Sequence, residues 1–133
     1  MYAMNQLEHL CSLKAKVTDL ISYGATPWGM RMDAHFEGDV AGGILNGKVR
    51  GVDYITVRSD GVAELNVRAS VQTDDGICIG IEAKGYGKDG ELKDAHIRIV
   101  TGHEKYNWLT SKVIVGKGRS ADGGIELDYY YKP

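Results

Sequence analysis

One carboxylate interrupts an otherwise apolar face of an alternating segment. Asp53 is in step, at every second position, with Val49, Gly51, Ile55 and Val57. Because alternate residues of a strand share a face, Asp53 is expected to point toward the same interior as these neighbours. An unpaired buried carboxylate is costly, so it needs a partner, an opening to water or a function. The structural alternative is that Asp53 binds backbone groups at a bulge.

Further polar side chains interrupt apolar faces elsewhere. By the same alternation His9 is in step with Leu7, Cys11, Leu13, Ala15 and Val17, and Tyr129 and Tyr131 are in step with Ile125 and Leu127. A carboxylate, an imidazole and phenols around an apolar cavity suffice for general acid–base chemistry, and equally suffice to orient a ligand that nothing transforms. The alternatives are a structural, hydrogen-bonded histidine near the terminus, and tyrosines that only pack or form a subunit contact.

A third candidate is the alternating stretch that follows the turn-forming residues 24–29. Four ionisable residues lie on one side of it, and Met30, Met32, Ala34 and Phe36 on the other; the ionisable ones are Arg31, Asp33, His35 and Glu37. The default interpretation of such a row is a solvated outer wall. The turn at residues 24–29 is expected to deliver Arg31 to the rim of the fold, where it could assist ligand binding.

Other motifs do not support a specific chemistry. Residues 85–90, GYGKDG, match the dinucleotide pattern GxGxxG, but Asp89-Gly90 is a turn signal that leads into another strand and not into a helix. The four histidines fall in separate segments without ligand spacing, so no metal site is predicted. No serine is set in GxSxG, and neither Cys11 nor Cys78 has a flanking cue for nucleophilic catalysis.

The candidate side chains lie on alternating segments, and tight turns between these segments would bring them together. Four Asp-Gly pairs and one Asn-Gly pair are typical of two-residue hairpin turns, which need positive φ: Asn46-Gly47, Asp60-Gly61, Asp75-Gly76, Asp89-Gly90 and Asp122-Gly123. Between them lie alternating runs rich in Val, Ile, Tyr and Thr, as half-buried strands require.

The pattern predicts eight strands. They cover approximately residues 7–18, 29–41, 45–58, 62–73, 77–87, 92–102, 111–119 and 124–132. Residues 19–28 are expected to be a connection, and residues 103–110 to hold one helical turn. Sequential strands joined by hairpins can form a sandwich or a closed, mostly up-and-down antiparallel barrel. The barrel is favoured because no long crossover is evident and closure leaves no edge strands.

Length and composition fit one all-β domain spanning residues 1–133. The chain is 43% apolar and 26% charged, close to the globular average, and contains 18 glycines but only two prolines. A net charge of −2 gives no basic footprint, so nucleic acid is not an expected partner. Two cysteines, no signal-peptide pattern in MYAMNQLEHL and no apolar run of membrane-spanning length favour a cytoplasmic protein with reduced thiols.

Several segments in order resemble a known family. GATPWGMR, HFEG, GVDYITVRSDGVAELNVRA, TDDG, YNWLTSKVIVGKGR and IELDYYY resemble the family called domain of unknown function 3237, also uncharacterised protein family 0311. The likeness runs from about Leu7 to Tyr131. It implies a closed antiparallel barrel, lipocalin-like or of the allene oxide cyclase type. Barrels of this broader kind include cofactor-free isomerases, cyclases and lyases as well as plain binders, so the fold does not decide the activity.

The resemblance also carries over to single positions. The family's Gly-x-Arg falls on Gly29-Met30-Arg31 and its Gly-x-Asp-aromatic on Gly51-Val52-Asp53-Tyr54. The segment before HFEG and the region between Gly87 and His96 are shorter than in many members, and both lie where a barrel mouth could be shaped. Asp53 is the residue that both lines of reasoning select.

Three functions follow as hypotheses. The first is a binder that encloses a small apolar organic ligand, steered by Asp53 with His9, Arg31 or Tyr129. The second is a cofactor-free isomerase, cyclase or lyase in which Asp53 or His9 moves a proton. The third is a homo-oligomer without a pocket. No cofactor, metal or membrane is expected in any of them, and a homo-oligomer is expected as the assembled form.

Overall fold

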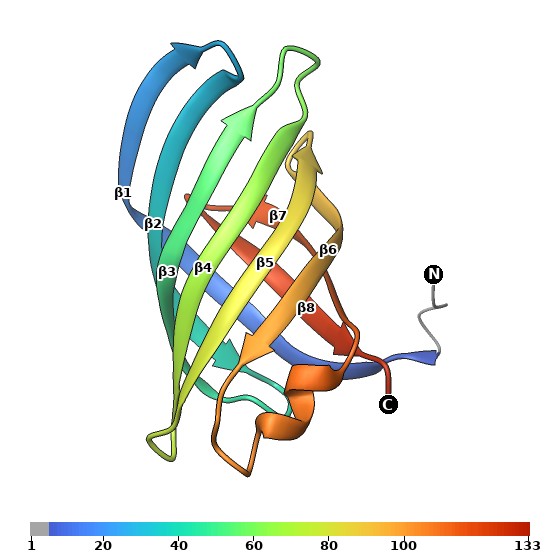
Figure 1. Ribbon diagram of the computed structural model, residues 1–133. Helices are drawn as coiled ribbons and strands as arrows, with labels where there is room; N and C mark the ends of the chain where they lie inside the picture. The colour runs from blue at the N-terminus through green and yellow to red at the C-terminus, as the bar shows by residue number, and fades with distance from the viewer. Residues whose placement is uncertain (1–5) are drawn as a thin grey trace.

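The computed structural model describes residues 6–133 and is a closed antiparallel barrel of eight strands, as the turn pattern predicts. The strands are β1 (Glu8–Thr26), β2 (Gly29–Ala41), β3 (Gly47–Val57), β4 (Ala63–Thr73), β5 (Cys78–Lys88), β6 (Glu91–Val100), β7 (Ile114–Ala121) and β8 (Gly124–Tyr131). Each strand pairs with the next along the chain, and β8 closes the barrel against β1 (Figure 1). The expectation about a signal peptide falls partly on residues 1–5, which lie outside the described residues.

Hairpin turns join the strands at both ends of the barrel (Figure 1), and two of them have the predicted geometry. Asp89-Gly90 and Asp122-Gly123 both have positive φ at each position, as a type I′ turn requires. At residues 60–61 and 75–76 only the glycine has positive φ. The prediction of a two-residue turn at Asn46-Gly47 is wrong. Neither residue has positive φ, and Gly47 is already the first residue of β3, paired with Val40 of β2.

The first strand is longer than expected. Residues 19–26, expected as a connection, continue β1 and pair with β2 as far as Thr26↔Gly29. Beyond Lys16, β1 has no β8 partner in the ladder, so this part of the hairpin extends past the closed barrel (Figure 1). We call residues 17–33 the arm. Several of its apolar side chains are exposed: Val17, Leu20, Ile21, Tyr23, Trp28 and Met30.

The opposite end of the barrel is closed. The 3-10 helix η2 (Asn107–Ser111) lies across it within the β6–β7 connection, where one helical turn is expected (Figure 1). Leu109 of this helix is fully buried, and so are Leu10 and Leu45. These residues belong to the same apolar core, so within residues 6–133 this end is filled by side chains.

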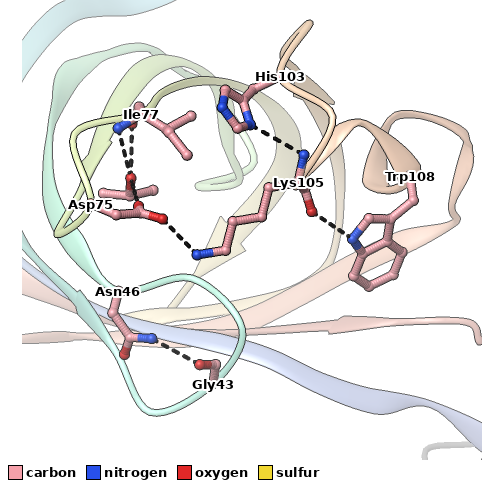
Figure 2. Close-up of polar contacts among 8 residues, drawn as sticks. Gly43, Asn46, Asp75, Ile77, His103, Lys105 and Trp108 are labelled. Carbon is pink, nitrogen blue, oxygen red and sulfur yellow. Dashed lines mark hydrogen bonds and ion pairs between the residues drawn. The ribbon is translucent and has the colours of Figure 1, made fainter.

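An ion pair joins this closing segment to the β4–β5 turn, and further hydrogen bonds lie within the segment (Figure 2). Lys105 Nζ forms an ion pair with Asp75 Oδ2 in the β4–β5 turn at 2.5 Å. The Lys105 amide donates to His103 Nδ1, and Trp108 Nε1 donates to the Lys105 carbonyl oxygen at 3.2 Å. The Lys105 ammonium and a Thr73 hydroxyl bond lower the pKa of Asp75 to about 2. The segment is therefore held through backbone and side-chain bonds at several points.

No helix among residues 6–133 is long and apolar enough to span a membrane.

Candidate functional site

The barrel encloses an apolar cavity of about 370 Å³. Its walls come from lumen-facing positions that alternate along the strands, among them Leu13, Ala34, Val49, Val67 and Ala83. Residues of the β3–β4 and β5–β6 turns and the strand ends beside the β7–β8 turn also line it, so the cavity reaches the end of the barrel opposite η2. The size is in the range of cavities that hold small organic ligands.

Asp53 lies on the wall of this cavity. β3 runs from Gly47 to Asp53 in unbroken register with both neighbouring strands, so the alternation counted from Val49 reaches Asp53 unchanged. Its neighbours across the ladder are Ala34 on β2 and Val67 on β4, and both are cavity-lining residues. Among the described residues no basic side chain forms an ion pair with Asp53.

The Asp53 carboxylate also takes part in the sheet. The β3–β4 ladder is regular up to Asp53↔Val67 and resumes at Thr56↔Glu64. In the interruption, the Asn66 backbone N–H donates to Asp53 Oδ1 at 3.1 Å. Asp53 therefore binds a backbone group and also faces the cavity. The expected bulge is absent, because the pairs on both sides of the interruption, Asp53↔Val67 and Thr56↔Glu64, keep the same register.

Burial sets the protonation of Asp53. It raises the pKa of the carboxyl group from 3.8 to about 6, against a smaller lowering by the Asn66 amide. A group with this pKa is present in both protonation states near neutral pH, which is a requirement for a general acid or base.

Two further titratable groups lie deep in the barrel. Tyr129 lines the cavity and is only 3% exposed, and its hydroxyl has no hydrogen-bond partner among residues 6–133. Burial raises the pKa of Tyr129 well above its ordinary range, with smaller contributions from Cys11 and Asp53. Burial likewise raises the pKa of the Cys11 thiol to about 12, so it stays protonated and is a poor nucleophile.

His9 lies outside the cavity, because β1 contains a bulge that alternation does not reveal. The register with β8 shifts between His9 and Cys11, so that Leu10 and Cys11 are both fully buried. The prediction that His9 and Cys11 share one face of the strand is therefore wrong. His9 Nε2 instead lies 3.2 Å from Asp128 Oδ1 and 3.1 Å from the Ser12 hydroxyl.

The cluster of His9, Ser12 and Asp128 is not arranged as a catalytic triad. The Ser12 hydroxyl donates directly to Asp128, and the His9 contacts to both partners use the same ring nitrogen. In a triad the imidazole instead lies between the serine and the acid and uses its two nitrogens separately. The hydrogen bond from the Ser12 hydroxyl lowers the pKa of Asp128, and the contact with His9 lowers it further by a smaller amount.

Arg31 also lies away from the cavity. Its Nη2 donates to Asp33 Oδ1 at 2.8 Å, and its guanidinium lies over the Tyr54 ring at 5.4 Å. The Tyr23 hydroxyl donates to the other Asp33 oxygen at 2.8 Å. Arg31 and Asp33 thus fix the arm from the outer side of β2. His35 and Glu37 follow them along the outer wall, where they line an open hollow.

Tyr131 shares the strand face of Tyr129 but makes a different contact. Its hydroxyl donates to Glu8 Oε2 at 2.7 Å, and its ring packs edge-on against Trp108. Within the described chain, no three His, Cys, Asp or Glu side chains gather as metal ligands. Deep in the cavity, the titratable groups on the lining among the described residues are therefore one carboxyl group and one phenol, in an apolar enclosure.

Comparisons with known proteins agree on one family. The family model "Protein of unknown function (DUF3237)" matches residues 5–95 and 93–132. A UPF0311 protein of Bradyrhizobium diazoefficiens is 30% identical over 142 residues, which cover 92% of this chain and 93% of that protein.

Solved structures share the barrel. A β-barrel-like protein of Acinetobacter baumannii is 26% identical with a TM-score of 0.86, covering 95% of this chain and 94% of its own. A structure described as an enzyme from Penicillium herquei is 22% identical with a TM-score of 0.76, covering 96% of this chain and 93% of its own.

Proposed function

The chain belongs to the DUF3237 family of proteins of unknown function, and from this premise we propose that it binds one small, mainly apolar organic molecule inside its barrel. The observation that carries the proposal is the placement of Asp53, a carboxyl group with no ion-pair partner among residues 6–133, on the wall of an apolar cavity of about 370 Å³.

The energetics of Asp53 support this proposal. A carboxylate whose pKa is raised by burial destabilises the folded protein at neutral pH. An apolar residue of similar size would line the same wall without this cost. Costly polar groups in apolar cavities are typical of sites that fix the orientation of a ligand.

A fluorescence titration tests binding in the lumen. The neutral apolar dye N-phenylnaphthylamine should bind the wild-type protein with a saturable increase in emission. Val67→Trp fills the cavity next to Asp53, whereas Val52→Trp places the same ring on the neighbouring strand at an outer position. Dye binding should disappear in Val67→Trp and persist in Val52→Trp. Equal binding by both variants would exclude the lumen as the site.

A second candidate is a cofactor-free enzyme that moves a proton, and the pKa of Asp53 near 6 favours it. Asp53 would act as the acid or base, with the Tyr129 hydroxyl as a neighbouring polar group. The barrel from Penicillium herquei is described as an enzyme, and at 22% identity the likeness supports the fold alone.

Recovery of a bound molecule separates the two candidates. Native mass spectrometry of freshly purified protein would identify a co-purified ligand, which is then incubated with wild type and with Asp53→Asn. An isomerase, cyclase or lyase changes the ligand in the wild-type sample only, while both proteins still bind it. A plain binder returns the ligand unchanged from both.

Homo-oligomer formation remains a separate prediction. The exposed apolar side chains of the arm, including Leu20, Tyr23 and Trp28, favour self-association. Light scattering coupled to size-exclusion chromatography should give a mass above that of a single chain. Trp28→Ser should lower that mass, and a single-chain mass for the wild type would contradict the prediction.

A further inference from the structure

We propose that the lumen selects ligands whose polar group donates a hydrogen bond, namely alcohols and amines, and rejects organic anions of the same shape. This rests on the proposed function, because it assumes that a small molecule occupies the cavity. It adds the chemical class of the polar group, which the apolar walls do not determine.

The first argument is the charge inside the barrel. Asp53 is the only residue with a charged side chain at a lumen-facing strand position deep in the cavity, within the chain that the structure describes. The other charged residues on the lining belong to the mouth or point outward: Lys84, Lys88, Asp89, Glu91 and Arg119. Lys84 is exposed and alternates with the lumen-facing Ala83 and Gly85, so its ammonium does not neutralise Asp53.

The second argument is the unused hydrogen-bonding capacity of Asp53. An ionised carboxylate can accept about four hydrogen bonds. One is supplied by the Asn66 amide to Oδ1, and no described group donates to Oδ2. A ligand hydroxyl or ammonium group can supply a further donor, whereas a ligand carboxylate has none to give.

The third argument is the Tyr129 hydroxyl. It is a buried phenol without a partner among the described residues, on the lining of the same cavity, and it feels the charge of Asp53. A neutral phenol both donates and accepts. A ligand alcohol could therefore donate to Asp53 and interact with Tyr129, so that one small polar group satisfies both side chains.

An organic anion meets the opposite conditions. Its charge would enter a low-dielectric cavity next to a like charge, where repulsion is far stronger than in water. No basic side chain at a lumen-facing depth is available among the described residues to offset it. Exclusion of the anion is therefore a consequence of the single acid in the wall.

A matched set of rigid ligands tests the inference. Adamantanol, adamantylamine and adamantane carboxylate share one compact apolar body, which prevents the polar group from stretching out to the charged residues of the mouth. Each would compete with N-phenylnaphthylamine at pH 8. In the wild-type protein the alcohol and the amine should displace the dye, and the carboxylate should be weaker by about tenfold or more.

Asp53→Asn is the diagnostic variant, since it keeps the size of the side chain and an acceptor for the Asn66 amide. The carboxylate should then gain affinity by about tenfold and the amine should lose a similar factor. Carboxylate binding as tight as alcohol binding in the wild type would overturn the selectivity while leaving lumen binding intact. Failure of the dye itself to bind would overturn the proposed function instead.

Discussion

The Asp53 carboxylate accepts a hydrogen bond from the Asn66 backbone N–H at 3.1 Å and faces the apolar lumen of the barrel. The Asp53 side chain thus binds a main-chain N–H where the β3–β4 ladder is interrupted. It also supplies the charged group deep in the cavity. The hydrogen bond from the Asn66 N–H lowers the pKa of Asp53 by less than burial raises it, so that the pKa stays at about 6.

The first prediction concerns stability against pH. Because folding raises the pKa of Asp53 from 3.8 to about 6, the folded state favours the protonated acid. The contribution of Asp53 to the free energy of unfolding is fully present below pH 3.8 and is lost as the pH rises through 6. Asp53→Asn should therefore increase the free energy of unfolding at pH 8 by about 2 kcal/mol, allowing for water in the open lumen, and should have little effect near pH 3.5.

Urea denaturation at the two pH values measures this difference. Asp33→Asn is the matched control, because Asp33 accepts bonds from Arg31 and Tyr23 on the outer side of β2. It should lower stability at pH 8, opposite in sign to Asp53→Asn. A loss of stability at pH 8 in both variants would contradict the description of Asp53.

The second prediction concerns the Tyr129 hydroxyl. Tyr129 borders the cavity and its hydroxyl has no protein hydrogen-bond partner among the described residues, so Tyr129→Phe removes a polar group from an apolar wall and keeps the ring. Stability should rise by about 1 kcal/mol, while adamantanol affinity falls severalfold. Thermal unfolding and dye competition measure the two effects. A large loss of stability would mean that the hydroxyl has a structural partner.

The third prediction concerns the arm. The Tyr23 hydroxyl bond to Asp33 links β1 beyond the barrel to β2. Tyr23→Phe should leave the unfolding temperature of the barrel unchanged and speed chymotrypsin cleavage in residues 17–33 severalfold. Tyr86→Phe, at a similarly exposed tyrosine, is the control and should not alter cleavage. Equal cleavage rates in both variants would show that this bond does not fix the arm.

The fourth prediction concerns close approach of β1 and β2. A Cβ at Gly38 would lie 2.0 Å from the Lys14 carbonyl oxygen, so the strands must separate to accept it. Gly38→Ala should lower the free energy of unfolding by about 3 kcal/mol. Gly102→Ala, where a Cβ meets nothing within 4 Å, should be nearly neutral. Chemical denaturation compares the pair, and similar stabilities would contradict the register of β1 on β2.

The barrel and the orientation of Asp53 were predictable because they depend on local rules. Turn pairs such as Asp89-Gly90 need no tertiary information, and β3 has no bulge between Val49 and Asp53. His9 was assigned to the wrong face because the bulge before Cys11 inserts one residue into β1 without a Gly or Pro to signal it. The Asn66 donor was not predictable either, since it is a main-chain group.

The arm shows a similar limit of local reasoning. Asp19, Gly24 and Pro27 are typical of a connection, yet β1 continues to Thr26 because β2 supplies pairing partners from Ser12 to Thr26, interrupted only by register shifts at Thr18 and Tyr23. Asp33 accepts from Tyr23, which lies at the register shift between Ser22 and Gly24, and alternation does not reveal this shift. Side-chain alternation alone therefore predicts only that Asp33 lies on the outer side.

The central claim is that the Asp53 carboxyl group lies in an apolar lumen, and its own titration is the most direct test. Carbon-13 NMR of the Asp53 side-chain carboxyl, assigned with Asp53→Asn, should give a pKa of about 6. A pKa at or below 3.8 would place the carboxylate in water or beside a cation, and would contradict both the proposed site and the anion selectivity.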